Sequence, residues 1–318
     1  MLKKYIKCQI CPRNCRVNRS QGQRGYCGQP EEIYLARAAL HMWEEPCISG
    51  KSGSGTVFFS GCSLHCVFCQ NGEIANGVVG KKVAPERLVE IFFELQEKGA
   101  NNINLVTADH YIPTVAWALQ SAKAQGLSLP VVYNTGSYIK IEALKQLEGL
   151  VEIYLPDFKY YDNALASRYA KALDYPQTAK AAITEMVRQT GEPLFYLKHT
   201  HTTLSAEEYN DYAGIDEALM KKGTIVRHLL LPDGIEDSKA VIRYLTDTYG
   251  KEIYISILNQ YTPVKTFVDY PELNRKVTDA EYEEIIDFAI AYGIENGFIQ
   301  EGDTAQESFI PAFDYEGV

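Results

Sequence analysis

Several features that define other classes of protein are missing from this sequence. No apolar run approaches the ~18 residues that cross a bilayer, so we expect no membrane segment. The lysine-rich N-terminus lacks the apolar core of a signal peptide, so we expect a cytoplasmic protein. Lys and Arg number 31 against 41 Asp and Glu, giving a net charge of −10. This balance argues against a protein that holds nucleic acid through bulk positive charge.

Cysteine is absent from the whole chain beyond Cys69, although the protein has 318 residues. All eight cysteines lie between Cys8 and Cys69. A secreted scaffold would distribute its cysteines as disulfide partners along a short chain, whereas clustered cysteines in a cytosolic protein more often bind metal. The distribution therefore predicts one or two metal centres in the N-terminal part of the chain.

Strand and helix patterns alternate through most of the remaining sequence. Short β-branched or aromatic runs predict buried strands at 57–59, 103–106, 131–133, 153–155, 225–231 and 253–257. Helical patterns lie between them, at 85–98, 115–119, 141–147 and 183–187. This alternation predicts an α/β fold, specifically a partial (β/α)6 barrel of parallel strands.

The predicted barrel occupies residues 51–262, with further segments on either side. Residues 1–50 read as a small, loop-rich, Cys-rich N-terminal module, because they combine five cysteines with many turn residues. An insertion is expected within 194–222, because the spacing of the predicted strands is too wide there for one crossover. Residues 263–318 should form a C-terminal helix, capped by Thr278 with Glu281 three residues on, and a docking tail from residue 298.

Three cysteines directly follow the first predicted strand, in the segment GCSLHCVFCQN. Cys62, Cys66 and Cys69 can bind three irons of a [4Fe–4S] cluster and leave the fourth iron open for a substrate or cosubstrate. A loop after a barrel strand lies on the face where such barrels keep their active sites. The alternative is a structural zinc site that takes a fourth ligand, such as His65.

The C-x3-C-x2-C spacing, with Phe68 before the last cysteine, resembles the signature of the radical S-adenosylmethionine (SAM) superfamily. The segments VYNTGSY, IYLPDFKY, IVRHLLLP and ILNQYTP resemble the PflX-type branch, which is similar to pyruvate formate-lyase-activating enzymes. The resemblance implies that the open iron chelates SAM, and that the reduced cluster cleaves SAM to a 5′-deoxyadenosyl radical that abstracts hydrogen. It also implies an electron donor such as flavodoxin or ferredoxin.

The same resemblance implies residues that contact SAM. Asp157 and Lys159 match an Asp-x-Lys at a strand end, and His228 matches a strand that ends in R-H-x-x-x-P. Asn134, with Thr135, lies where the family has a polar turn, and Phe68 flanks the cluster. Without the resemblance, Asp157 and Lys159 read as a surface pair and His228 as a hydrogen-bonded core histidine.

One position departs from the superfamily pattern. Many members carry Gly-Gly-Glu after the second strand to bind the SAM amine, whereas this chain has Thr107, Ala108 and Asp109. Asp109 can supply the acid of that motif or cap the helix that follows, and we expect the cap.

A second cysteine set, Cys8, Cys11, Cys15 and Cys27, precedes the triplet. Four soft ligands at short spacing suit zinc or an additional iron–sulfur cluster, and the alternative is ordinary thiols. Cys47 stands alone and is expected to be a buried small apolar residue. His199 and His201 lack a third ligand, so we assign them no metal.

The sequence leaves three functions open. The first is a radical SAM enzyme that activates a glycyl-radical enzyme, which would then be its protein partner. The second is a radical SAM enzyme that acts directly on a small molecule or peptide. The third is a non-catalytic metalloprotein that uses the cysteines structurally.

Overall fold

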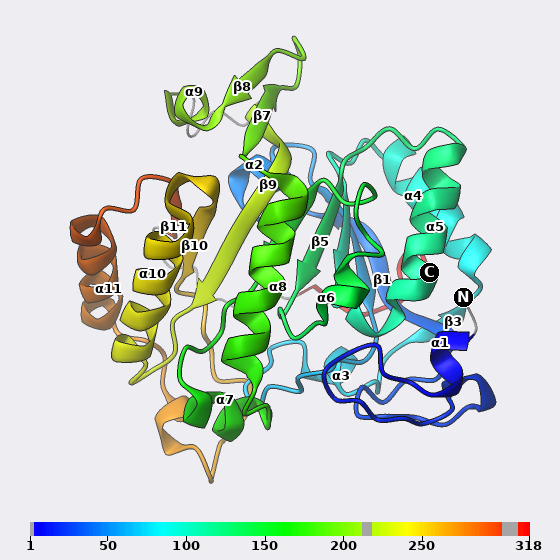
Figure 1. Ribbon diagram of the computed structural model, residues 1–318, viewed down its shortest axis with the longest axis horizontal. Helices are drawn as coiled ribbons and strands as arrows, with labels where there is room; N and C mark the ends of the chain where they lie inside the picture. The colour runs from blue at the N-terminus through cyan, green and yellow to red at the C-terminus, as the bar shows by residue number, and fades with distance from the viewer. Residues whose placement is uncertain (1–2, 212–217, 301–310) are drawn as a thin grey trace.

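A computed structural model describes residues 3–211, 218–300 and 311–318 of the chain (Figure 1). Its centre is one sheet with the strand order β11-β10-β9-β6-β5-β4-β2-β1-β3. Neighbouring strands from β2 to β11 run parallel. These strands are β2 (Ser54–Phe59), β4 (Ile103–Val106), β5 (Val131–Thr135), β6 (Ile153–Pro156), β9 (Ala218–Leu229), β10 (Tyr254–Leu258) and β11 (Gly297–Ile299). The six predicted strands are therefore confirmed.

Helices alternate with these strands and cover one face of the sheet (Figure 1). The longer ones are α4 (Pro85–Glu97), α5 (Ile112–Ala124), α8 (Tyr175–Thr190), α10 (Ile235–Tyr249) and α11 (Asp279–Tyr292). Shorter helices are α1 (Lys3–Ile6), α2 (Pro46–Ser49), α3 (Gly72–Ala75), α6 (Ile141–Leu144) and α7 (Asn163–Ala170). The α/β fold of the partial (β/α)6 barrel is confirmed.

Alternate residues of each strand face opposite sides of the sheet, and this alternation separates the core from the site. Val57 and Phe59 of β2 belong to the same buried apolar cluster as Leu88 and Phe92 of α4. Phe58, between them, belongs to a different cluster and lines the cavity described below. The helix-covered face is therefore the main core, and the opposite face of the sheet is available for a site.

The prediction of a loop-rich segment over the first fifty residues is wrong for one stretch. Ile33–His41 forms β1, which pairs antiparallel with β2, and β3 (Lys81–Val83) extends the sheet beyond β1. The segment IYLARAALH contains three alanines, and alanine is depleted in strands, so local propensity does not predict this strand. Pairing with β2 supplies the stabilisation that the sequence pattern does not show.

The predicted insertion is confirmed. The strands β7 (Leu194–Leu197) and β8 (Thr203–Ser205) pair with each other, and β7 pairs with the beginning of β9. With α9 (Ala206–Asp211) they protrude at the end of the sheet where β9 begins (Figure 1). His199 and His201 lie in the β7–β8 turn, at the opposite end of the strands from the cysteine triplet.

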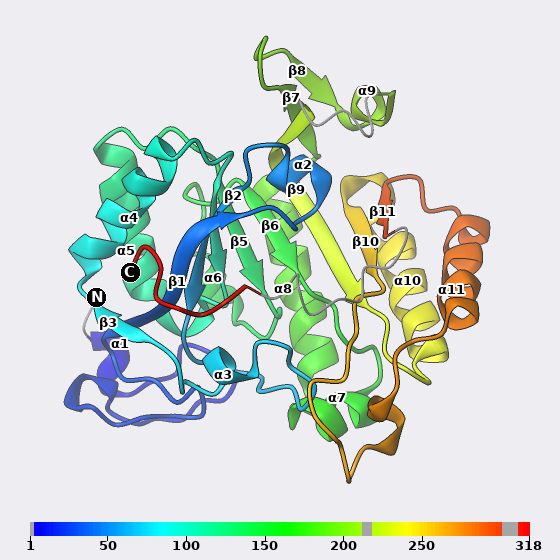
Figure 2. The same ribbon diagram turned by 180° about the vertical axis from the view of Figure 1, so that it is seen from behind.

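The C-terminal predictions are confirmed where the structure describes them. Thr278 and Glu281 form a reciprocal capping box at the start of α11. Residues 311–318 lie along β1 (Figure 2), where Arg37 forms ion pairs with Asp314 and Glu316. The rest of the predicted tail, residues 301–310, lies outside the described residues. In the described ranges no helix is both long and apolar enough to cross a bilayer.

Candidate metal and cofactor site

The cysteine triplet lies at the edge of the sheet where the parallel strands end. Gly61, with φ of +89°, turns the chain out of β2 and directly precedes Cys62. The side chains of Cys62, Cys66 and Cys69 line one cavity of about 260 Å³. Strand ends on β4, β5, β6, β9 and β10 contribute the other walls, so the cavity lies where barrel enzymes bind their ligands.

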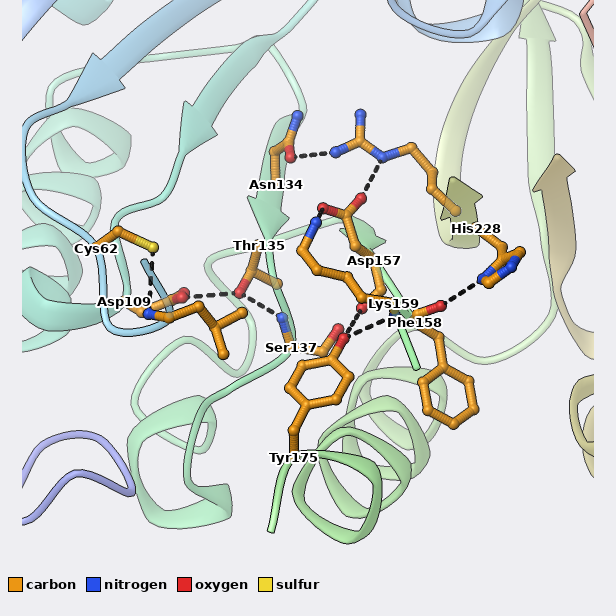
Figure 3. Close-up of polar contacts among 12 residues, drawn as sticks. Cys62, Asp109, Asn134, Thr135, Ser137, Asp157, Phe158, Lys159, Tyr175 and His228 are labelled. Carbon is orange, nitrogen blue, oxygen red and sulfur yellow. Dashed lines mark hydrogen bonds and ion pairs between the residues drawn. The ribbon is translucent and has the colours of Figure 1, made fainter. Parts of the chain in front are cut away.

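The three thiols suit iron–sulfur coordination chemically. The backbone N–H of Leu64 donates to Sγ of Cys62 at 3.3 Å (Figure 3), and such bonds stabilise a thiolate. Burial raises the pKa of the Cys62 thiol to about 11 and that of the Cys69 thiol to about 12. A bound metal deprotonates its thiol ligands, so cluster assembly here would release protons.

In the described part of the chain, no three His, Cys, Asp or Glu side chains converge on a point suited to one metal ion. A [4Fe–4S] cluster takes one iron per cysteine, so its ligands surround the cluster rather than a single point. The donor set therefore fits such a cluster, with three thiols on one wall of the cavity. His65, the ligand considered for zinc, is outside the cavity lining and bonds Asn76 at 2.9 Å.

A network of partly buried charges forms another wall of the cavity (Figure 3). Nε of Arg227 donates to Asp157 at 2.9 Å, and its Nη2 donates to the side-chain oxygen of Asn134 at 2.6 Å. Its Nη1 donates to Glu44 at 3.1 Å. Lys159 pairs with the other carboxylate oxygen of Asp157 at 2.7 Å. Arg227 thus joins β9 to β5, β6 and the segment after β1.

The pKa values of the two acids in the network are shifted in opposite directions. Burial by itself would raise the pKa of Asp157, but Arg227 and Lys159 outweigh it and lower the pKa. Burial raises the pKa of Glu44 despite its contact with Arg227. Lys159 lies close enough to Cys66 and Cys69 to favour their thiolate forms. The predicted residues Asn134, Asp157 and Lys159 are therefore brought together beside the triplet.

The expectation that Asp109 caps a helix is wrong. The helix α5 begins at Ile112 without a side-chain cap, and the short 3-10 turn over Asp109–Tyr111 has none either. The Asp109 carboxylate instead faces the cavity and accepts a hydrogen bond from Thr135 at 3.0 Å (Figure 3). It accepts another from Tyr133 at 3.1 Å. Burial raises its pKa to about 6. In the described residues, no cation forms an ion pair with it.

Phe68 and His228, both predicted to contact SAM, lie in different surroundings. Phe68 lines the cavity and packs edge-to-face against three tyrosines. His228 lies outside the cavity lining, with Nδ1 bonded to the Phe158 carbonyl at 2.7 Å and Nε2 to Ser238 at 2.8 Å. Burial lowers its pKa and favours the neutral ring. A SAM contact from His228 stays a prediction, and both ring nitrogens already have protein partners.

Sequence reasoning missed Arg227 and Glu44. Arg227 adjoins His228 in the segment IVRHLLLP, and strand alternation sends neighbouring side chains to opposite faces of the sheet. This alternation could have revealed Arg227 from the sequence, since it places one of Arg227 and His228 on the cavity side of the sheet and the other on the core side. Glu44 lies in an irregular segment, and no sequence pattern marked it.

Comparisons with known proteins agree with an iron–sulfur site. Residues 48–152, about a third of the chain, match the family of 4Fe-4S single cluster domains, and this range includes the triplet. An uncharacterized protein of Methanocaldococcus jannaschii is 26% identical over 299 residues, covering 92% of this chain and 76% of that protein.

Solved structures show a weaker likeness. The FeFe-hydrogenase maturase HydG from Carboxydothermus hydrogenoformans is 13% identical, with a TM-score of 0.47 over 78% of this chain and 54% of that chain. Streptococcus suis SuiB bound to precursor peptide SuiA is 12% identical, with a TM-score of 0.43 over 76% of this chain and 46% of that chain. The chain spans about half the length of these two proteins.

The charge network yields a prediction about stability. Replacing Arg227 with Met would leave Asp157 and Glu44 buried without their shared cation. Asp157 would keep its ion pair with Lys159, whereas Glu44 would lose its ion pair. Leaving a largely buried polar group without its partner typically costs about 1–3 kcal/mol, so Arg227→Met should lower the free energy of unfolding by about that amount. Arg227→Lys keeps the charge and should cost less. Urea denaturation measures both, and equal midpoints for wild type and Arg227→Met would contradict the role assigned to the network.

Proposed function

We propose that this protein is a radical SAM enzyme. The observation that carries the proposal is the single cavity lined both by the three cysteines and by the carboxylate of Asp109. The match of residues 48–152 to a 4Fe-4S domain supports the cluster, and the resemblance of the motifs supports the superfamily. A purely structural metalloprotein would have no need for a cavity beside its metal ligands.

Cys62, Cys66 and Cys69 would hold a [4Fe–4S] cluster with one open iron. When bound, that cluster supplies the electron that cleaves SAM and generates a radical able to abstract hydrogen. The protein's own contribution is to hold and shield the group. Lys159 offsets negative charge near Cys66 and Cys69, and Phe68 with its tyrosine neighbours excludes water from one side.

Asp109 would bind the ammonium group of SAM. Its carboxylate accepts two hydrogen bonds from neutral donors, which orient it without neutralising its charge. Asp157, Asn134 and Arg227, by contrast, already satisfy one another. Asp157, Asn134 and Lys159 line the same cavity or its edge and would complete the SAM site beside Asp109.

The substrate is a separate part of the proposal. The resemblance to pyruvate formate-lyase-activating enzymes favours hydrogen abstraction from a glycyl-radical enzyme, with flavodoxin or ferredoxin as electron donor. An enzyme that acts directly on a small molecule or peptide would use the same cluster and SAM site.

The triplet is tested by electron paramagnetic resonance of the reduced protein. Wild-type protein reconstituted anaerobically should give a cluster signal that changes when SAM is added, because SAM binds the open iron. Replacing Cys62, Cys66 and Cys69 together with Ala should remove this SAM-responsive signal. Cys47→Ala is the matched control, since Cys47 is buried and lies outside the cavity lining. A SAM-responsive signal that survives in the triple variant would refute the assignment.

Asp109 gives the SAM site a pH dependence. The pKa of its carboxyl group is raised to about 6, so the group loses its charge as the pH falls through that value. A hydrogen bond to a charged group contributes about 1.5–3 kcal/mol, so Asp109→Asn should weaken SAM binding roughly tenfold or more at pH 7.5.

Calorimetric titration of the reconstituted protein with SAM at pH 7.5 and pH 5.5 measures both effects. Wild-type affinity should fall at the lower pH, whereas the already weak Asp109→Asn variant should change much less. Asp157 stays ionised across this range because its pKa is lowered, which leaves Glu44 as the other cavity acid with a raised pKa. An equal pH effect in wild type and Asp109→Asn would exclude Asp109 as the ammonium-binding group.

A further inference from the structure

The four N-terminal cysteines gather in one small region outside the cavity. Cys8, Cys11 and Cys27 are buried and Cys15 is partly exposed. The other three all lie close enough to Cys11 to act on it electrostatically. The two halves of this region approach closely at Gly25, where a Cβ atom would lie 2.9 Å from Sγ of Cys15. Glycine at this position therefore permits the approach that brings Cys15 beside Cys27.

The backbone around these cysteines directs N–H groups at sulfur. Sγ of Cys15 accepts a hydrogen bond from the backbone N–H of Tyr26 at 3.2 Å. The backbone N–H of Arg13 bonds Cys11, and that of Gln29 bonds Cys27. In the last two, the donor lies two residues after the cysteine, as Leu64 does after Cys62 in the triplet. Such donors stabilise negatively charged sulfur, and metal-bound cysteine is thiolate.

Arg19 supplies a second, independent observation. Its side chain is 0% exposed, and its guanidinium donates to the carbonyls of Pro30 and His110 at 2.6 Å each. It approaches Sγ of Cys8 at 3.9 Å. In the part of the chain that the structure describes, no carboxylate forms an ion pair with it. Arginine keeps its proton in proteins, and Glu31, although near enough to feel this charge, forms no ion pair with it. The buried cation therefore has no directly bonded anion.

We propose that Cys8, Cys11, Cys15 and Cys27 bind a second metal centre through four thiolates, with Arg19 as its buried counter-charge. Four thiolates around a zinc ion or an iron–sulfur cluster carry net negative charge, which would balance the charge of Arg19. In the described residues, these thiols do not converge on a point suited to one metal ion. Metal binding would therefore rotate the four side chains toward the metal.

The centre would also fix the loop that carries the triplet. Arg13, between Cys11 and Cys15, donates to the carbonyls of Ser63 at 2.8 Å and Leu64 at 3.4 Å. A Cβ atom on Gly61 would lie 2.6 Å from the carbonyl oxygen of Cys27, so the two loops are in direct contact. This consequence for the triplet loop rests on the proposed function, whereas the metal centre itself does not.

The experiment isolates the N-terminal centre from the proposed cluster. The full chain carrying Cys62→Ala, Cys66→Ala and Cys69→Ala is expressed with zinc and iron supplied, purified anaerobically and analysed for metal by mass spectrometry. We expect it to retain about one zinc or about four irons per chain, and the two results identify the kind of centre. Adding Cys8→Ser and Cys11→Ser should remove this metal, whereas adding Cys47→Ala should not.

The outcomes separate the two proposals. Loss of metal only on replacement of Cys8 and Cys11 supports the second centre, whatever the triplet does. A folded triplet-free chain without stoichiometric metal would overturn it, and so would metal that survives the Cys8 and Cys11 replacements.

Arg19 is tested in the otherwise unaltered chain, which also covers the case of a triplet-free variant that does not fold. Arg19→Met should release metal to a chelator faster than wild type, and Arg19→Lys, which keeps the charge, should release it more slowly than Arg19→Met. Resistance of residues 3–32 to protease should fall in parallel with metal loss. Equal release from wild type and Arg19→Met would refute the counter-charge role.

Discussion

The buried guanidinium of Arg227 is the interaction on which the cavity depends. It donates to Asn134 at the end of β5, to Asp157 after β6 and to Glu44 after β1, so one side chain holds three separate segments at the carboxyl edge of the sheet. Removing the cation would leave Glu44 without an ion pair and Asp157 with Lys159 alone. The position of Asp157, and through it Lys159, relative to the cysteines follows from this contact.

Asp157 and Asp109, two of the three acids that line the cavity, have different roles in this account because their surroundings differ. Asp157 is neutralised by Arg227 and Lys159 and acts as part of the wall. Asp109 receives hydrogen bonds from Tyr133 and Thr135 and keeps its charge for a ligand. Separation of the roles of two nearby carboxylates by environment is a general route to a functional site. It explains how a chain without the Gly-Gly-Glu motif still presents an acid near the triplet.

Much of the fold and part of the site follow from sequence patterns. Continuous β-branched runs mark the parallel strands, and the spacing of Cys62, Cys66 and Cys69 marks the metal-binding loop. The strand β1 is not predicted from the sequence, because alanine is uncommon in strands. Its stability comes from pairing with β2. Asp109 was misassigned because a local capping pattern says nothing about Tyr133 and Thr135, which reach it from a neighbouring strand. Arg227 can be found from the sequence only by applying strand alternation to Arg227 and His228, which places these adjacent polar residues on opposite faces of the sheet.

The central claim is that the triplet and Asp109 form a site for reductive cleavage of SAM. The most direct test is the formation of 5′-deoxyadenosine by the reconstituted protein, incubated anaerobically with SAM and dithionite and analysed by liquid chromatography. The account predicts slow formation without any added substrate in wild type and in Cys47→Ala, and none above background when the three cysteines are replaced. A protein with a full complement of iron that forms no 5′-deoxyadenosine, or formation that persists without the triplet, would contradict it.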